Sequence, residues 1–205
     1  MKFAVFVSGN GSNLQAIIDA VKRGDIKAEL ALVVSDRRKA LALKRAAEAG
    51  IKTVCLVRKD YASPQSYERD LVISLKNEGI DFIVLAGFMK VLSPFFIKAY
   101  PNKILNVHPS LLPAFKGARG IKDTFTYGTK VAGVTIHFVD DKMDHGPIIA
   151  QQAFRIHPKE TLKSLEERVH KVEHQIFPKA IALFAEGRLK ITGRKVHVLD
   201  HPKRK

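Results

Sequence analysis

The chain has 205 residues, of which 46% are hydrophobic and 27% are charged, as in an ordinary soluble globular protein, but its formal net charge is +15. Its one cysteine, Cys55, excludes a disulfide within the chain and favours a reducing compartment. The apolar run at residues 3–7 is too short for a signal peptide or a membrane span, so we expect a cytoplasmic protein without membrane association.

The first half of the chain alternates predicted strands and helices. Strands are expected at residues 2–7, 30–34, 52–57 and 81–86, and helices at residues 13–21, 39–49 and 64–77. Ser63 and Pro64 fit the start of the third helix, and Gly50 fits the end of the second. The strand at 81–86 has almost no polar alternation, as when both faces of a sheet are covered. The pattern therefore predicts an α/β fold, a doubly wound and mostly parallel central sheet with helices on both faces.

The second half changes character. A buried strand is expected at residues 103–107, followed by an antiparallel pair at 130–139 and 147–154 and a helix at 161–185. Pro178 lies inside that helix and is expected to kink or divide it. A short segment at residues 188–199 closes the chain. No repeat or long linker is present, so we expect one domain over residues 1–205.

Two polar side chains at the end of the 103–107 strand indicate chemistry. Asn106 and His108 are two residues apart, so both can face one cavity, and Pro109 ends the strand. The amide of Asn106 can polarise a carbonyl, and His108 can exchange a proton near neutral pH. The Asp144 carboxylate, if close, would raise the pKa of His108 and fix its tautomer. The three residues predict acyl transfer to a nucleophile carried by the substrate.

A glycine-rich turn at residues 9–13 lies between the first strand and the first helix. Such a turn can hold a phosphate on its backbone N–H groups, although a plain tight turn is an equal alternative. A dinucleotide fingerprint needs a third glycine where Leu14 stands, so that cofactor is not favoured and Asp36 is interpreted as a loop residue.

Several motifs in a fixed order resemble the folate-dependent formyltransferases over nearly the whole chain. They are Ser-Gly-Asn-Gly-Ser-Asn-Leu-Gln-Ala-Ile at 8–17, Leu-Ala-Gly-Phe-Met at 85–89, Asn-x-His-Pro-Ser-Leu-Leu-Pro at 106–113 and Gly-Val-Thr-Ile-His-Phe-Val at 133–139 before Asp144. The resemblance is strongest to the branch that formylates phosphoribosylglycinamide. It implies a formyltransferase-like fold and transfer of a formyl group from 10-formyltetrahydrofolate to the amine of phosphoribosylglycinamide in purine (IMP) biosynthesis.

The resemblance also implies roles for individual residues. Asn106 and protonated His108 would polarise the formyl oxygen, while Asp144 keeps His108 charged and helps to relay a proton. The residues implied for the phosphorylated substrate are Gly11, Ser12, Asn13, His170 and Glu173. Those implied for the formyl folate are Met89, Lys90, Val91, Leu92, Asn106, Asp140, Asp141, Lys142, Met143 and Asp144. Residues 1–100 would form a phosphate-binding half and residues 101–205 a catalytic and folate-binding half. No metal is expected.

The chain departs from the family pattern at several places. His170 stands where many relatives have Gln, Arg119 where His is common, and His145 where Thr or Gly is commoner. Pro64 lies where some relatives carry an Arg that meets the folate tail. His137, inside the 130–139 strand, is interpreted as structural.

Three alternatives stay open. Initiator methionyl-tRNA formyltransferases are about half as long again and lack the glycine-rich turn, and formyltetrahydrofolate hydrolases usually carry an extra regulatory domain. A basic nucleotide-binding module without catalysis would leave Asn106, His108 and Asp144 unexplained.

The net charge favours acidic partners or, more simply, a solvated lysine-rich surface. The basic residues are scattered except for a terminal cluster of Arg188, Lys190, Arg194, Lys195, Lys203, Arg204 and Lys205. No aromatic residue interleaves that cluster, so no base-stacking platform is predicted there. We expect small-molecule substrates, no nucleic acid, and a monomer or homodimer.

Overall fold

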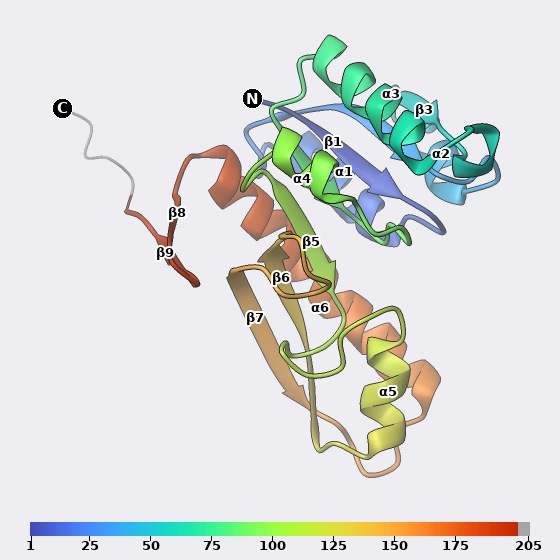
Figure 1. Ribbon diagram of the computed structural model, residues 1–205. Helices are drawn as coiled ribbons and strands as arrows, with labels where there is room; N and C mark the ends of the chain where they lie inside the picture. The colour runs from blue at the N-terminus through green and yellow to red at the C-terminus, as the bar shows by residue number, and fades with distance from the viewer. Residues whose placement is uncertain (201–205) are drawn as a thin grey trace.

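A nine-stranded sheet runs through the computed structural model, which describes residues 1–200 (Figure 1). Its strand order is β3-β2-β1-β4-β5-β6-β7-β9-β8. Three members of the predicted basic cluster, Lys203, Arg204 and Lys205, lie outside the described residues.

The first half builds the parallel part of the sheet. Its elements are β1 (Lys2–Val7), α1 (Ser12–Lys22), β2 (Glu29–Ser35), α2 (Leu41–Glu48), β3 (Lys52–Cys55), the 3-10 turn η1 (Arg58–Asp60), α3 (Pro64–Asn77), β4 (Phe82–Leu85) and α4 (Pro94–Ala99). β1 to β5 are all parallel, which confirms the doubly wound arrangement expected from the sequence. Ser63 caps α3 through a capping box with Ser66, and Pro64 follows at the first turn.

The second half adds antiparallel strands. Its elements are β5 (Ile104–His108), α5 (Gly120–Tyr127), β6 (Val131–Phe138), β7 (Ile148–Arg155), α6 (Leu162–Ala185), β8 (Leu189–Thr192) and β9 (Lys195–Val198). β6 pairs antiparallel with both β5 and β7, which confirms the predicted strand pair. The closing segment is a hairpin, and β9 pairs parallel with the start of β7.

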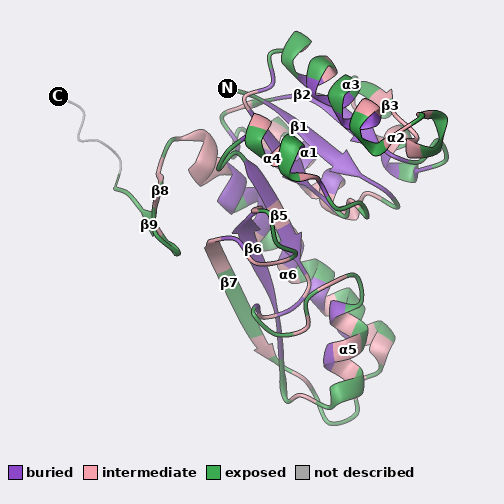
Figure 2. Ribbon diagram, in the orientation of Figure 1, coloured by how far each residue is buried: buried purple, intermediate pink, exposed green. Residues whose placement is uncertain are grey.

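The two faces of the sheet bury alternate residues of the same strands. In β1, Phe3, Val5 and Val7 belong to the core beneath α1, α2 and α6, while Ala4 and Phe6 belong to the core beneath α3 and α4. Side chains of a strand point to opposite faces in turn, so β1 has to be apolar at every buried position. Figure 2 shows the consequence: the central strands are buried, and the exposed residues of the helices face outward.

Three features of the helices were not expected from the sequence. The helices α4 and α5 were missed because they are short and carry little periodic signal. Of the two outcomes expected at Pro178, division of the helix is excluded, because α6 is continuous over 24 residues, and a kink stays a prediction. Phe177 and Ile181, on either side of Pro178, are fully buried, and this packing offsets the one lost backbone hydrogen bond. No helix within residues 1–200 is long and apolar enough to cross a membrane.

The order of the strands places two loops beside each other. β1 lies between β2 and β4 in the sheet. The chain leaves the parallel strands β1 and β4 at the same edge, and from there it continues to β2 on one side and to β5 on the other. The Ser8 N–H donates to the Gly87 carbonyl at 3.2 Å, and the Met89 N–H donates to Ser8 Oγ at 2.8 Å. The glycine-rich turn after β1 and the 86–92 loop after β4 are therefore tied together.

The Thr135 hydroxyl fixes the segment that follows β5. It donates to the Ser110 carbonyl at 2.7 Å and accepts from the Leu112 N–H at 3.0 Å and from Gln151 Nε2 at 2.9 Å. Thr135 is fully buried, and the Ser110 carbonyl and the Leu112 N–H depend on this one oxygen, whereas Gln151 Nε2 also donates to the Leu112 carbonyl at 3.0 Å. A cis bond joins Leu112 to Pro113 in the same segment.

We expect Thr135→Val to lower the free energy of unfolding by about 2–4 kcal/mol, because it leaves several buried polar groups without a partner. Thr135→Ser keeps the oxygen and should cost only about 1 kcal/mol for the lost methyl group. Urea unfolding of the three proteins measures both values. Equal costs for Val and Ser would mean that the hydroxyl contributes nothing.

Candidate active site

A cavity of about 300 Å³ opens at the carboxyl ends of β4 and β5. Its wall brings together residues 89–92 from the loop after β4, Asn106 and His108 from β5, and residues 140–144 from the loop between β6 and β7. Every residue that the family resemblance implied for the formyl folate lies in this wall. The Asp144 loop, residues 139–147, forms one side of it.

The β5–β6 register sets Asn106 opposite His137. His137 Nδ1 lies 2.8 Å from the Phe138 carbonyl, so Nδ1 carries the ring proton and Nε2 is the acceptor. Asn106 Nδ2 lies 3.1 Å from that Nε2 and donates to it. This contact fixes which way the amide points and leaves its second N–H for a ligand in the cavity.

His108 is held by a backbone carbonyl. Its Nε2–H donates to the Phe115 oxygen at 2.9 Å, and its Nδ1 lies 3.4 Å from Asp144 Oδ2. The proton on Nε2 is thus held by the fold, and Nδ1 is the nitrogen that can gain or lose a proton.

The Asp144 carboxylate is anchored by one backbone hydrogen bond and lies beside the His137 ring. The Gly117 N–H donates to Oδ2 at 2.7 Å, and His137 Nε2 lies 3.7 Å from Oδ1. Burial raises the pKa of Asp144, but His137 and the Gly117 N–H together lower it to about 2. Asp144 is therefore ionised at neutral pH. Its backbone has φ +46°, a left-handed conformation that is uncommon for a residue other than glycine.

One sequence expectation about the pair is wrong. Asp144 was expected to lift the pKa of His108 above its ordinary value, but burial lowers that pKa and outweighs the opposing effect of the Asp144 carboxylate. His108 is only 3% exposed, so loss of water costs the imidazolium more than one neighbouring anion returns. At neutral pH the resting histidine is neutral.

His137 contacts the candidate catalytic residues, which the sequence interpretation did not foresee. It was interpreted as structural, and it contacts Asn106, lies beside Asp144 and is 2% exposed within the cavity wall. The pattern of single residues on β6 does not reveal this, because it follows only from the cross-strand register.

The glycine-rich turn is shaped by α2. Gly11 has φ +78°, and a Cβ placed there would lie 2.6 Å from the Cβ of Ala42. Arg45 donates from Nε to the Asn10 carbonyl at 3.0 Å and from Nη2 to the Asn10 side-chain Oδ1 at 3.2 Å. The turn is thus rigid, and α1 begins at Ser12 with the N–H groups of its first turn available for an anion.

The residues implied for the phosphorylated substrate meet at one point. Glu173 on α6 is 3% exposed, and its Oε2 accepts from Asn13 Nδ2 at 2.8 Å and lies 3.0 Å from His170 Nδ1. The hydrogen bond to Glu173 raises the pKa of His170. Glu173 also acts electrostatically on His108, so this polar cluster borders the candidate catalytic residues.

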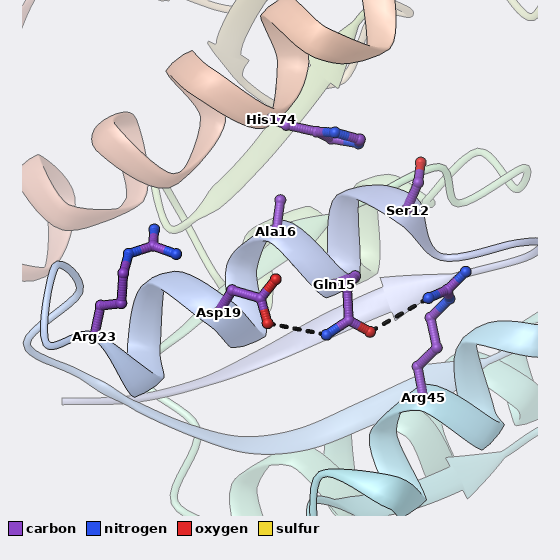
Figure 3. Close-up of a pocket in the computed structure, with 7 residues that line it drawn as sticks. All are labelled: Ser12, Gln15, Ala16, Asp19, Arg23, Arg45 and His174. Atoms are coloured by element: carbon purple, nitrogen blue, oxygen red, sulfur yellow. Dashed lines mark hydrogen bonds between the residues drawn. The ribbon is translucent and has the colours of Figure 1, made fainter. Parts of the chain in front are cut away.

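A second hollow, of about 380 Å³, lies along α1 (Figure 3). Ser12, Asp19 and Arg23 line it from the α1 side, Arg45 from α2 and His174 from α6. Gln15 connects Asp19 to Arg45 across its floor through hydrogen bonds of 3.0 and 3.3 Å. This hollow begins at the end of the glycine-rich turn.

The chain is similar to known formyltransferases over most of its length. The sequence model of the family described as formyl transferase matches residues 1–181. Phosphoribosylglycinamide formyltransferase of Bacillus subtilis is 42% identical over 180 residues, which cover 88% of this chain and 92% of that protein. The Escherichia coli protein of the same name is 41% identical, with 93% and 90% covered.

The chain is also similar to part of a larger protein and to a solved structure. The trifunctional purine biosynthetic protein adenosine-3 of Drosophila melanogaster is 43% identical over 91% of this chain, which spans 14% of that protein. The crystal structure of glycinamide ribonucleotide transformylase 1 from Symbiobacterium toebii matches with a TM-score of 0.95 and 43% identity, covering 98% of this chain and 94% of that one.

The opposite directions of two histidine pKa values can be measured in one NMR titration. His108 should titrate below the ordinary value of about 6.5 and His170 above it, because burial acts on the first and Glu173 on the second. Asp144→Asn should lower the pKa of His108 further, since it removes an anion that favours the imidazolium. A pKa of His108 above that of His170 would contradict this electrostatic description.

Proposed function

The chain belongs to the formyl transferase family, and we infer that it is an enzyme that transfers a formyl group to the amine of phosphoribosylglycinamide in purine biosynthesis. One observation supports this acceptor above all: the rigid turn at Gly11 and the buried Glu173 adjoin the Asn106–His108–Asp144 set. Relatives that carry this function in their names are matched over about nine tenths of both chains, 88% and 92% in one and 93% and 90% in another.

We propose 10-formyltetrahydrofolate as the donor, bound in the cavity beneath the Asp144 loop. Met89, Val91 and Met143 line that cavity and are 54%, 75% and 56% exposed. Apolar side chains around a hollow are typical of a site for a flat heterocycle, which would cover them. The backbone of residues 89–92 and 140–144 lies at the same wall and would supply polar contacts to the heterocycle's edge.

The proposed role of Asn106 is to stabilise the oxygen of the formyl group. One of its amide hydrogens is already donated to His137, so the other points with little freedom. A donor held in place before the reaction costs no reorganisation when negative charge develops on the oxygen. His137 is accordingly a positioning residue for Asn106.

His108 and Asp144 are proposed to move the proton. The substrate amine attacks the formyl carbon, a new carbon–nitrogen bond forms, and the bond from that carbon to the folate nitrogen breaks. The Nδ1 atom of His108, which is neutral at rest, takes the proton from the substrate amine. The resulting imidazolium is stabilised by the Asp144 carboxylate, 3.4 Å away. The proton then passes to the departing folate nitrogen. This scheme replaces the protonated resting His108 expected from the sequence, and no step in it calls for a metal.

The phosphorylated substrate is proposed to lie between α1 and α6. The N–H groups of Gly11, Ser12 and Asn13 would hold its phosphate at the positive end of α1. The Glu173 carboxylate would accept from the glycinamide amine, and His170 would stand beside it where the ribose or phosphate passes. We further propose that the enzyme works in the cytoplasm as a monomer or homodimer without nucleic acid, with a phosphate-binding half at 1–100 and a catalytic half at 101–205.

Mixing the protein with 10-formyltetrahydrofolate and phosphoribosylglycinamide should change the folate absorbance, whereas methionyl-tRNA should not react.

Asn106→Ala and His108→Ala should each lower turnover by about a hundredfold or more, the usual contribution of an oxyanion donor or general base. His157→Ala, which removes an exposed histidine, is the matched control. Transfer to methionyl-tRNA alone would overturn the proposed acceptor, and near-normal turnover of a folded variant would remove that residue from the scheme.

Gly11→Ala should raise the KM for phosphoribosylglycinamide by about tenfold or more, because the new Cβ would overlap with Ala42 and displace the phosphate-binding backbone. Gly24→Ala is a matched control, since Gly24 has φ +79° but open space around it. Both variants carry the cost of a left-handed alanine, about 1–2 kcal/mol, so only the overlap differs. Initial rates at varied concentrations of each substrate measure the effect. Equal increases in the KM for folate and for phosphoribosylglycinamide would indicate general misfolding instead.

A further inference from the structure

The C-terminal hairpin contacts the Asp144 loop. β8 and β9 are joined by the turn Gly193–Arg194, and β9 pairs through Lys195 with Ile148, the first residue of β7. Ile148 follows the Asp144 loop directly, so this pairing brings the hairpin turn to the loop (Figure 1). Arg194 is the residue that reaches across.

Arg194 holds His145 at two points. One guanidinium nitrogen donates to the His145 carbonyl at 2.7 Å, and the other lies 3.1 Å from the His145 Nε2. The same guanidinium nitrogen also lies 3.4 Å from the His145 Nδ1, so it faces both nitrogens of the ring. The planar fork of arginine suits such a pair of contacts, which a lysine could not make together.

The other ring nitrogen of His145 extends the chain of contacts to Asp140. Nδ1 lies 2.7 Å from Asp140 Oδ2, and because a carboxylate oxygen can only accept, Nδ1 carries a proton and donates it. Asp140 Oδ1 accepts in turn from the Lys142 N–H at 3.1 Å. Arg194, His145 and Asp140 are therefore connected by one continuous row of contacts. Asp140 and His145 belong to the loop, and Asp144 lies between them in the sequence.

The loop is otherwise fixed at Asp144, by the hydrogen bond from the Gly117 N–H, and at its two ends. Its ends are closed by a hydrogen bond of 2.9 Å from the Phe138 N–H to the Pro147 carbonyl. Gly146 lies so close to Phe138 that a Cβ would meet the Phe138 oxygen at 1.8 Å. Between these ends Asp144 adopts φ +46°, a conformation that surrounding contacts must maintain.

We propose that Arg194 is a positioning residue for the reaction: through His145 and Asp140 it holds the Asp144 loop in the conformation that presents Asp144 to His108 and closes the folate cavity. This inference rests on the proposed function of the cavity. His145 and Arg194 then act as one unit, in which the hairpin at the end of the chain sets the geometry of the catalytic loop.

The test is steady-state kinetics of Arg194→Ala, Arg194→Lys and the matched control Lys195→Ala, which removes the same charge from the neighbouring residue. Arg194→Ala should lower kcat and raise the KM for 10-formyltetrahydrofolate, together about tenfold in kcat/KM, as expected when a reacting group is displaced slightly. The KM for phosphoribosylglycinamide should stay within about twofold, because the cavity wall that the loop forms includes neither Glu173 nor the glycine-rich turn. Arg194→Lys should recover part of the loss, and Lys195→Ala should match the wild type.

A second comparison tests whether the effect passes through His145. His145→Gly removes the ring and keeps the carbonyl, so if the two residues form one unit, the double variant with Arg194→Ala should lose less than the product of the two single losses. Losses that multiply, or an Arg194→Ala variant that affects both substrates equally with a lower Tm, would overturn the proposal in favour of a merely structural hairpin.

Hydrogen exchange separates this inference from the proposed function. Should the wild-type protein transfer no formyl group, the proposed function fails, yet Arg194→Ala should still speed amide exchange across residues 140–146 relative to Lys195→Ala. Unchanged exchange in that loop would overturn the positioning role whatever the reaction.

Discussion

The antiparallel register between β5 and β6 is the constraint on which the site depends. It sets Asn106 opposite His137 and His108 opposite Thr135, so the two polar residues of β5 each have a polar neighbour across the ladder. A shift of β6 by one residue would turn His137 and Thr135 to the other face. His137 would then no longer orient the Asn106 amide, and Thr135 could not hold the segment that leads from His108 to Phe115.

That register also determines the charge of the site. Because His108 and His137 both lie on buried backbone, each is held by a carbonyl, and each presents its other nitrogen to the Asp144 side. Asp144 is thus an anion that faces one nitrogen of each ring. Burial prevails over this anion in setting the pKa of His108, so the resting pair is a carboxylate and a neutral imidazole, which is suited to receive a proton.

The sequence predicted the larger part of the fold because its strands and helices are strongly periodic. Every predicted strand and helix ended within two residues of the observed one, and the triplet of Asn106, His108 and Asp144 was recognisable as a motif. Three kinds of information were out of reach. The partnership of His137 depends on a cross-strand register, the low pKa of His108 depends on the depth of burial, and the contact of Arg194 with His145 joins residues 49 apart in the chain. Local pattern carries none of these.

The left-handed backbone of Asp144 has a consequence for substitutions at this position. Glycine adopts φ +46° without the strain that a side chain brings, about 1–2 kcal/mol. A glycine here would relieve that strain, but it would leave the Gly117 N–H without its acceptor and remove the carboxylate beside His108. The loop thus holds its anion at a local cost in backbone conformation, which a neutral residue without a side chain would not carry.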